Sequence, residues 1–114
     1  MPYINVTTSR ILSPEQKKTL SGEFGAIIHL LPNKTEKVLM MDFCDGHSLF
    51  FSGREMSNGA YVDVRIYGFA GYAQESEFTE KVYALLRDNL GLKENEVYVT
   101  IGQYRTWGSG GKLK

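Results

Sequence analysis

A proline directly after the initiator methionine is the first candidate for chemistry in this sequence. A small residue at position 2 usually permits removal of Met1, and here removal leaves the secondary amine of Pro2 at the chain end. A primary α-amine titrates at about 7.7–8.0, and a free proline amine is more basic. Because burial and a neighbouring positive charge both lower the pKa of an amine, a buried Pro2 beside a cation would be a base at neutral pH.

Cations are expected at the same end of the molecule. Lys34 lies a few residues before an expected strand, and the parallel strands of a β-α-β unit begin at one edge of the sheet, so Lys34 should lie near Pro2. If a second unit runs antiparallel to the first, Arg65 and Ile66 reach this edge as well. Without further support, Met-Pro is weak evidence and Lys34 is typical of a solvated loop charge.

The neighbouring polar residues leave alternatives open. Arg65 would equally pair with Asp63 or with Asp42 across the sheet. Asp42 in mid-strand favours an interface ion pair, whereas beside the proline it would support water activation or decarboxylation. Cys44 lies in Cys-Asp-Gly-His and lacks the second thiol of a redox pair, so we expect a buried structural cysteine.

No other reaction centre is indicated. The sequence has no Gly-x-Ser-x-Gly elbow and no phosphate-loop Gly-Lys-Ser. His29 and His47 lack ligand spacing and the one cysteine allows no internal disulfide, so we expect neither a metal nor another cofactor. Thirteen basic against thirteen acidic residues make nucleic acid an unfavoured partner. The glycine-rich segment 108–111 is interpreted as flexible chain rather than as a phosphate cradle.

Apolar spacing predicts two helices. Ser13, Pro14 and Gln16 form the start of the first helix, with a capping box, and Pro32 and Asn33 end it. Gly91 stands where a left-handed residue ends the second. The apolar faces consist of Leu20, Phe24, Ile27, Ile28 and Leu31 in the first helix and of Phe78, Val82, Leu85, Leu86 and Leu90 in the second.

Strands are predicted at residues 3–8, 38–43, 60–67 and 97–103, with a small hairpin arm at 47–51. The strand and helix patterns repeat after about 58 residues, so two β-α-β units, 2–58 and 60–114, are expected. They would form one mixed four-stranded sheet with both helices on one face, which is a two-layer α+β sandwich. Alternation within the strands predicts one apolar and one polar sheet face.

Length and composition agree with this architecture. A chain of 114 residues with 42% hydrophobic residues is long enough for a single domain, residues 1–114. The polar sheet face favours assembly into an oligomer, and the alternative is a monomer with a solvated face. No stretch is typical of a signal peptide or a membrane span, so a cytoplasmic protein without a membrane partner is expected.

Four segments together resemble the tautomerase superfamily, and most closely its branch similar to macrophage migration inhibitory factor. They are MPYINV, LLPNKTEKVLM, YVDVRIYGFAG and VYVTIGQYRTWGSGG, and the resemblance covers nearly the whole chain. It implies a cofactor-independent homotrimer that tautomerises small 2-keto acids such as phenylpyruvate. Signalling or host interaction with a vestigial pocket, and decarboxylase or dehalogenase chemistry, are the alternatives.

The resemblance also implies roles for individual residues. Pro2 matches the catalytic proline, and Lys34 matches a lysine facing the substrate carboxylate, with Asn33 as the alternative alignment. Ile66 matches a position whose backbone amide contacts the ligand. Tyr98 matches a tyrosine that closes the pocket from the adjacent subunit.

Trp107 resembles an aromatic wall of the family's pocket. Tyr3, Arg65 and Thr100 depart from the residues common in the family, and these departures could change the substrate. The chain also lacks the Cys-x-x-Cys motif of the vertebrate cytokine, so no redox activity is expected.

Overall fold

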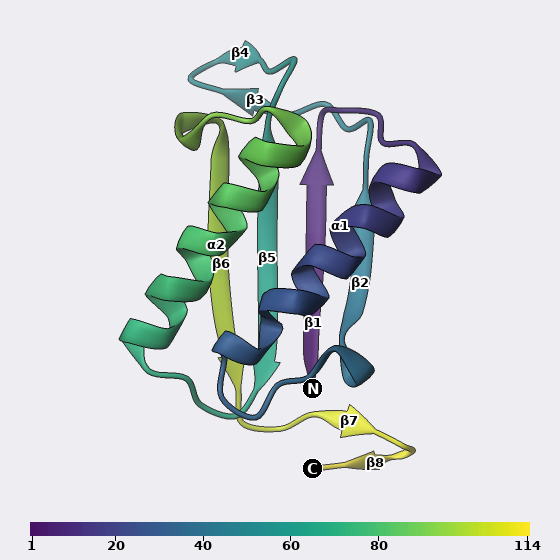
Figure 1. The fold of residues 1–114 in the computed structure, drawn as a ribbon, viewed down its shortest axis with the longest axis vertical. Helices are drawn as coiled ribbons and strands as arrows, with labels where there is room; N and C mark the ends of the chain where they lie inside the picture. Colours follow the sequence, from purple (N-terminus) through teal and green to yellow (C-terminus); the bar gives the residue numbers. More distant parts are fainter.

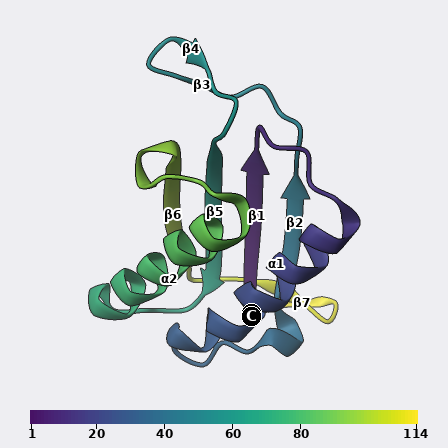
Figure 2. The same cartoon turned by 45° about the horizontal axis from the view of Figure 1, so that its top comes forward.

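Two helices cover one face of a four-stranded sheet in the computed structural model, which describes residues 1–114 (Figures 1 and 2). The strand order is β2-β1-β5-β6, with β1 parallel to β2, β5 parallel to β6, and β1 antiparallel to β5. The predicted mixed sheet and two-layer α+β architecture are therefore confirmed. The bounds are β1 Pro2–Thr8, α1 Pro14–Ile27, β2 Met40–Cys44, β5 Ala60–Tyr67, α2 Tyr72–Leu90 and β6 Val97–Tyr104.

The core lies between the sheet and the helices. Alternate residues of β1 and β5 are buried, as the sequence pattern predicted, and they pack against the apolar stripes of both helices. The buried hydrophobic residues form one cluster of 19 drawn from both β-α-β units. Because this core is shared, we propose that the two units fold as a single domain.

Helix ends follow local chemistry. The Gln16 N–H donates to Ser13 Oγ at 3.1 Å and the Ser13 N–H donates to Gln16 Oε1 at 2.8 Å, which confirms the capping box. Helix α1 ends earlier than predicted, at Ile27, and continues as a 3-10 turn over Ile28–Leu30. Leu31 is extended because it precedes a proline, which disfavours helical backbone. Gly91 ends α2 with a φ of 66°, as predicted.

Two shorter features before β5 differ from the expectations. Residues Glu36–Val38 form a 3-10 turn, so β2 begins at Met40 rather than at 38. The expected arm at 47–51 is a hairpin of β3, Phe50–Phe51, and β4, Arg54–Glu55.

The prediction of a flexible C-terminal segment is wrong, because β7, Gly108–Ser109, and β8, Lys112–Leu113, form a hairpin. Gly110 and Gly111 both have positive φ, at 61° and 85°, which two-residue hairpin turns require. Trp107 and Lys114 exchange backbone hydrogen bonds at the base of the hairpin.

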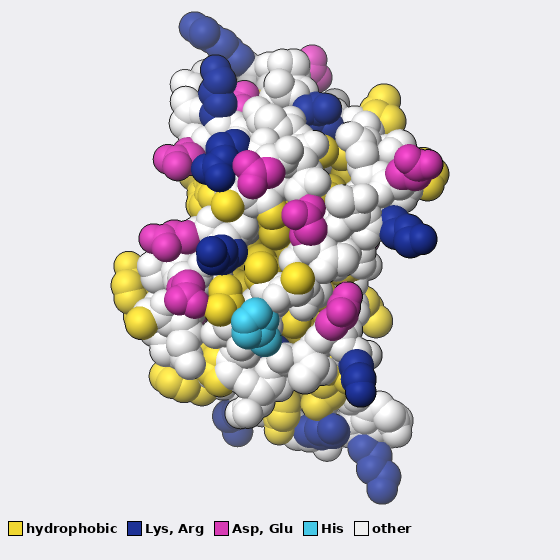
Figure 3. All heavy atoms as spheres, in the orientation of Figure 1, with side chains coloured by type: hydrophobic (Ala, Val, Ile, Leu, Met, Phe, Trp, Pro, Cys, Tyr) yellow, Lys and Arg dark blue, Asp and Glu magenta, His cyan; other side chains and the backbone are white.

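The helix-covered surface carries charges of both signs, with hydrophobic atoms visible between them (Figure 3). At the end where both termini lie, Lys and Arg side chains gather and no acidic side chain appears among them in this view (Figures 1 and 3). Neither helix is sufficiently long and apolar to cross a membrane.

Candidate active site

An open cleft of about 780 Å³ lies at the sheet edge where β1 begins and β5 ends. The β7–β8 hairpin lies beside this edge, close to the N-terminus (Figure 1). Four predicted site residues, Pro2, Tyr3, Arg65 and Trp107, line the cleft. The full lining is Met1, Pro2, Tyr3, Val38, Met40, Arg65, Tyr104, Thr106, Trp107, Gly108 and Ser109.

The chain end is electropositive. Pro2 is buried and pairs with Ile66 across the β1–β5 ladder, so its backbone is held in place. Burial lowers the pKa of the terminal amine on Met1, and the positive charges of Lys34 and Lys114 lower it further. The predicted proximity of Lys34 to the start of β1 is therefore reproduced, and Lys114 is a second cation at this end.

Lys34 is a buried cation without a carboxylate partner. Its exposed fraction is 7%, and its Nζ donates a hydrogen bond to the Pro32 carbonyl at 3.1 Å. None of the three ion pairs in the structure includes Lys34. Burial lowers the pKa of its ammonium group. A buried, unpaired ammonium favours binding of an anionic ligand, because such a ligand would supply the negative charge that Lys34 lacks as a partner.

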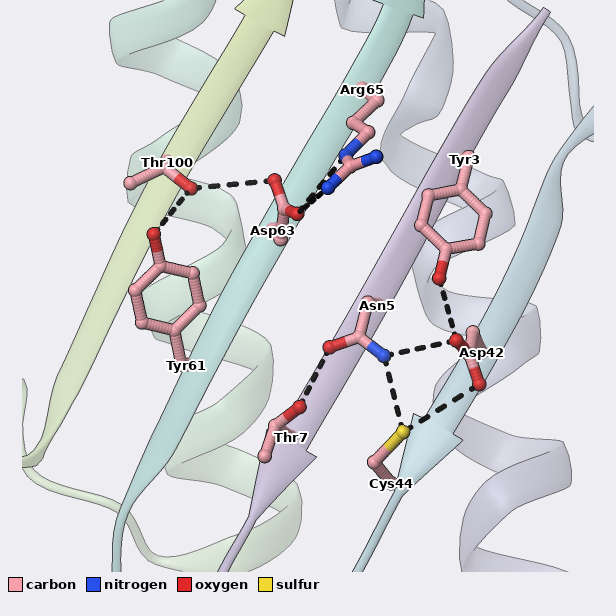
Figure 4. Close-up of polar contacts among 9 residues, drawn as sticks. All are labelled: Tyr3, Asn5, Thr7, Asp42, Cys44, Tyr61, Asp63, Arg65 and Thr100. Atoms are coloured by element: carbon pink, nitrogen blue, oxygen red, sulfur yellow. Dashed lines mark hydrogen bonds and ion pairs between the residues drawn. The ribbon is translucent and has the colours of Figure 1, made fainter. Parts of the chain in front are cut away.

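Arg65 extends over the polar face of the sheet, where it pairs with Asp63 (Figure 4). Its Nε donates to Asp63 Oδ2 at 3.1 Å, and Nη2 forms an ion pair with the same oxygen at 3.1 Å, so Asp63 rather than Asp42 is its partner within the chain. The guanidinium carbon lies 5.9 Å from the centre of the Tyr3 ring and 6.0 Å from that of Tyr104. The charge of Asp63 is the main reason why the pKa of Arg65 is raised.

Asp42 fixes the orientation of Tyr3. The Tyr3 hydroxyl donates to Asp42 Oδ2 at 2.6 Å, and Asn5 Nδ2 donates to the same oxygen at 3.1 Å (Figure 4). Within the chain Asp42 makes no ion pair, because the β1–β2 register places these neutral donors opposite it, and an ion pair across a subunit interface stays a prediction. The Tyr3 hydrogen bond is the main cause of a lowered pKa at Asp42 and of a raised pKa at Tyr3.

Cys44 lies on the same polar face as Asp42. It is half-buried rather than in the core, because residues two apart on β2 share a face, and Asn5 Nδ2 approaches its sulfur to 3.3 Å. The expectation of a fully buried structural cysteine is therefore wrong.

The remaining predicted residues lie outside the cleft. The Ile66 side chain is in the core, and only its backbone is next to Pro2. Asn33 is exposed with a φ of 58°, while the neighbouring Lys34 is buried. Tyr98 pairs with Tyr61 at the opposite end of β5, is 59% exposed, and packs edge-on against Phe51 at 5.8 Å. Within one protomer Tyr98 is therefore remote from Pro2.

Two contributors to the site were missed at the sequence level. Tyr104 lines the cleft and packs against Trp107 with ring centres 6.1 Å apart. Lys114 reaches the chain start, with its Nζ 4.0 Å from the Met1 sulfur. The Gly110-Gly111 pair was an available signal for the hairpin that brings Lys114 back to this edge.

No protein-family model and no curated protein sequence matches the chain. Solved structures do match. MIF2 of Leishmania major superposes with a TM-score of 0.91 at 24% identity, covering 100% of this chain and 97% of that one. Pt0534 inactivated by 2-oxo-3-pentynoate gives 0.83 at 16% identity, covering 96% and 93%.

N1, a member of the cis-3-chloroacrylic acid dehalogenase family, gives a TM-score of 0.81 at 19% identity, covering 97% of this chain and 82% of N1. Matches of this kind extend over nearly the whole chain although few residues are identical. The fold that the resemblance implied is thus confirmed, and this chain shares it with proteins of the macrophage migration inhibitory factor type.

Proposed function

We propose that this protein is a tautomerase-superfamily enzyme that interconverts the keto and enol forms of small 2-keto acids such as phenylpyruvate. One observation carries the proposal: Pro2 is buried and lines an open cleft, and the charge of Lys34, a buried cation without an acidic partner, reaches the chain start, where it lowers the pKa of the Met1 amine. A buried amine under the influence of an unpaired cation suits an acidic substrate that must lose a proton from carbon.

The mechanism requires the free amine of Pro2, so Met1 must be removed. Neutral Pro2 accepts a proton from the carbon next to the keto group, the C–H electrons form the carbon–carbon double bond, and the carbonyl electrons move to oxygen. Protonated Pro2 then returns the proton to that oxygen, which completes the enol. Such proton transfer contributes roughly 10²–10⁴-fold to the rate.

The cations have a separate task. Lys34 donates to the substrate carboxylate, and its charge keeps Pro2 unprotonated between turnovers. The backbone at Ile66 orients the substrate beside Pro2, and Trp107 with Tyr3 forms the walls. Orientation matters because a positioned base avoids most of the entropic cost of a bimolecular proton transfer.

We further propose that the active unit is a homotrimer in which Tyr98 completes the site of a neighbouring subunit. Two observations support this assembly. The sheet face opposite the helices carries polar side chains (Figure 4), and Tyr98 is an exposed aromatic residue remote from its own cleft. Tyrosines of this kind are common at subunit interfaces.

Two alternatives are less well supported. Decarboxylation or dehalogenation through an activated water calls for an acidic group near the proline, but no Asp or Glu lines the cleft. The carboxylate of Asp42 already accepts hydrogen bonds from Tyr3 and Asn5. Signalling with a vestigial pocket predicts a folded protein that does not turn over keto acids.

The decisive experiment is exchange of the carbon-bound proton of phenylpyruvate for deuterium, followed by proton NMR. We expect exchange with the wild-type protein and its loss in Pro2→Gly. Pro14→Gly, which replaces an exposed proline at the start of α1 outside the cleft lining, is the control for a generic proline effect. Equal exchange by Pro2→Gly and wild type would refute the proposed base.

A further inference from the structure

Two cations at this end of the sheet, Lys34 and Arg65, lie on opposite sides of it. Lys34 follows α1 in the helix layer, and its N–H donates to the carbonyl of Leu31, a core residue. Arg65 is exposed on the other face, because its neighbour Ile66 points into the core and successive strand residues alternate. Their positions therefore favour two separate acid-binding groups over one carboxylate shared by Lys34 and Arg65.

Arg65 forms a candidate binding site that is separate from Lys34. Asp63 occupies the Nε and Nη2 side of the guanidinium, and no hydrogen bond within the chain uses Nη1. In Figure 4 one guanidinium nitrogen points away from Asp63. Tyr3 and Tyr104 lie close to the guanidinium, and Asp42 holds Tyr3 through its hydroxyl. The guanidinium of Arg65 is thus held in one orientation, and the N–H groups of its Nη1 remain free to donate.

The surroundings of Arg65 favour a negative ligand. Arg65 is the only charged side chain among the cleft-lining residues. A guanidinium with free N–H groups presents a geometry that matches a carboxylate. The charge of Asp63 offsets part of the attraction but leaves these hydrogen-bond donors available.

We propose that Arg65 binds a second acidic group, so that the preferred substrates are 2-keto diacids. On the basis of the proposed function, Lys34 binds the 1-carboxylate and Arg65 binds the distal carboxylate. Pro2, between the two cations, faces the carbon chain that joins the carboxylates. Arg65 is then a specificity-determining residue rather than a second ligand of the reacting end.

The test compares diacids with monoacids of equal length: 2-oxoglutarate with 2-oxopentanoate, and 2-oxoadipate with 2-oxohexanoate. The measurement is kcat/KM for deuterium exchange at carbon 3. We expect the diacid to be preferred by about tenfold or more at one of the two lengths, as a charged hydrogen bond implies. In Arg65→Met the ratio should fall to about one, and Arg65→Lys should recover part of it.

Arg87→Met is the matched control, since Arg87 lies on α2 and pairs with Asp88 away from the cleft. Its diacid-to-monoacid ratio should equal that of the wild type. A wild-type ratio of about one at both lengths, or an undiminished ratio in Arg65→Met, would overturn the proposal. Circular dichroism verifies that each variant is folded.

Binding separates failure of this inference from failure of the proposed function. NMR titration of wild type and Arg65→Met with 2-oxoadipate and 2-oxohexanoate reports affinity without turnover. If no keto acid undergoes exchange, the tautomerase proposal fails, and Arg65-dependent tighter binding of the diacid still supports the second acid site. Equal affinities of diacid and monoacid in such a protein would overturn that site as well.

Discussion

Replacing Lys34 by alanine should change both the pH profile and substrate affinity. In the native chain, the charge of Lys34 is the largest cause, after burial, of the lowered pKa of the Met1 amine that precedes Pro2. Protonation of Pro2 is disfavoured by this like charge, so its removal in Lys34→Ala raises the pKa of Pro2. The acidic limb of kcat/KM, which reports the free base, should therefore move to higher pH.

The size of the two effects follows from different contacts. A like-charge interaction of about 1 kcal/mol corresponds to a shift of about 0.7 pH units. Pro2 remains buried in the variant, and burial disfavours the charged amine, so the limb should not reach the value of free proline. Loss of a charged hydrogen bond to the carboxylate costs roughly 1.5–3 kcal/mol, which raises KM by roughly 10- to 150-fold.

The assay is initial-rate kinetics with phenylpyruvate across the pH range for a set of lysine variants. Lys34→Arg keeps the charge and should restore the limb and part of the affinity. Lys81→Ala removes an exposed lysine of α2 and should leave both measurements unchanged. If Lys34→Ala has no effect while Asn33→Ala or Arg65→Ala changes both limb and KM, the carboxylate site has been assigned to the wrong residue.

Three further predictions follow from the chain start, the assembly and the polar face. Mass spectrometry should find Met1 absent. A protein with residues left ahead of Pro2 should be inactive, because the nitrogen of Pro2 is then an amide and not a base. Full activity of such a protein would contradict the mechanism. Light scattering should give a trimer. Mixed trimers of Pro2→Gly and Tyr98→Ala subunits should regain the activity that each variant lacks alone. A monomer at micromolar concentration would exclude the shared site. Tyr3→Phe should lower the free energy of unfolding by about 1 kcal/mol at pH 7, measured by denaturant titration. The pKa of Asp42 is lowered in the folded state, so this stabilisation is present above the ordinary value of 3.8 and is lost as pH falls through the lower folded pKa. A difference in unfolding free energy between Tyr3→Phe and wild type that persists below this folded pKa would contradict the contact.

The elements of the fold were predictable because their signals are local. The Ser13–Gln16 capping box and the left-handed Gly91 involve residues within one or two turns of each other. Apolar and polar residues alternate along β1 and β5, and this pattern indicates which face is buried, since successive strand residues point to opposite faces. The mixed four-stranded sheet followed from the repeat of two β-α-β units, whereas the antiparallel orientation of the second unit was left open by the sequence.

The contacts at the site were less predictable because they depend on register. Tyr3 and Asp42 are 39 residues apart, and they meet only because Tyr3 pairs with Met40, which places Asp42 two residues further along on the same face. A shift of one residue would turn Asp42 toward the helices. Proximity of Asp42 to Tyr3 could thus be anticipated only as one of several alternatives.

The alternation of β5 explains how this cleft can acquire a new specificity without a change in the core. Ile66 faces the helices and Arg65, its neighbour in the chain, faces the opposite side, so a substitution at 65 leaves the packing of 66 intact. Lys34 reaches the chain start from the helix layer, where its position depends on the turn after α1 rather than on β5. The acid-binding group beside Pro2 and the group on the polar face are therefore structurally independent. A change at Arg65 should alter which substrate is preferred, whereas a change at Lys34 should impair every keto acid.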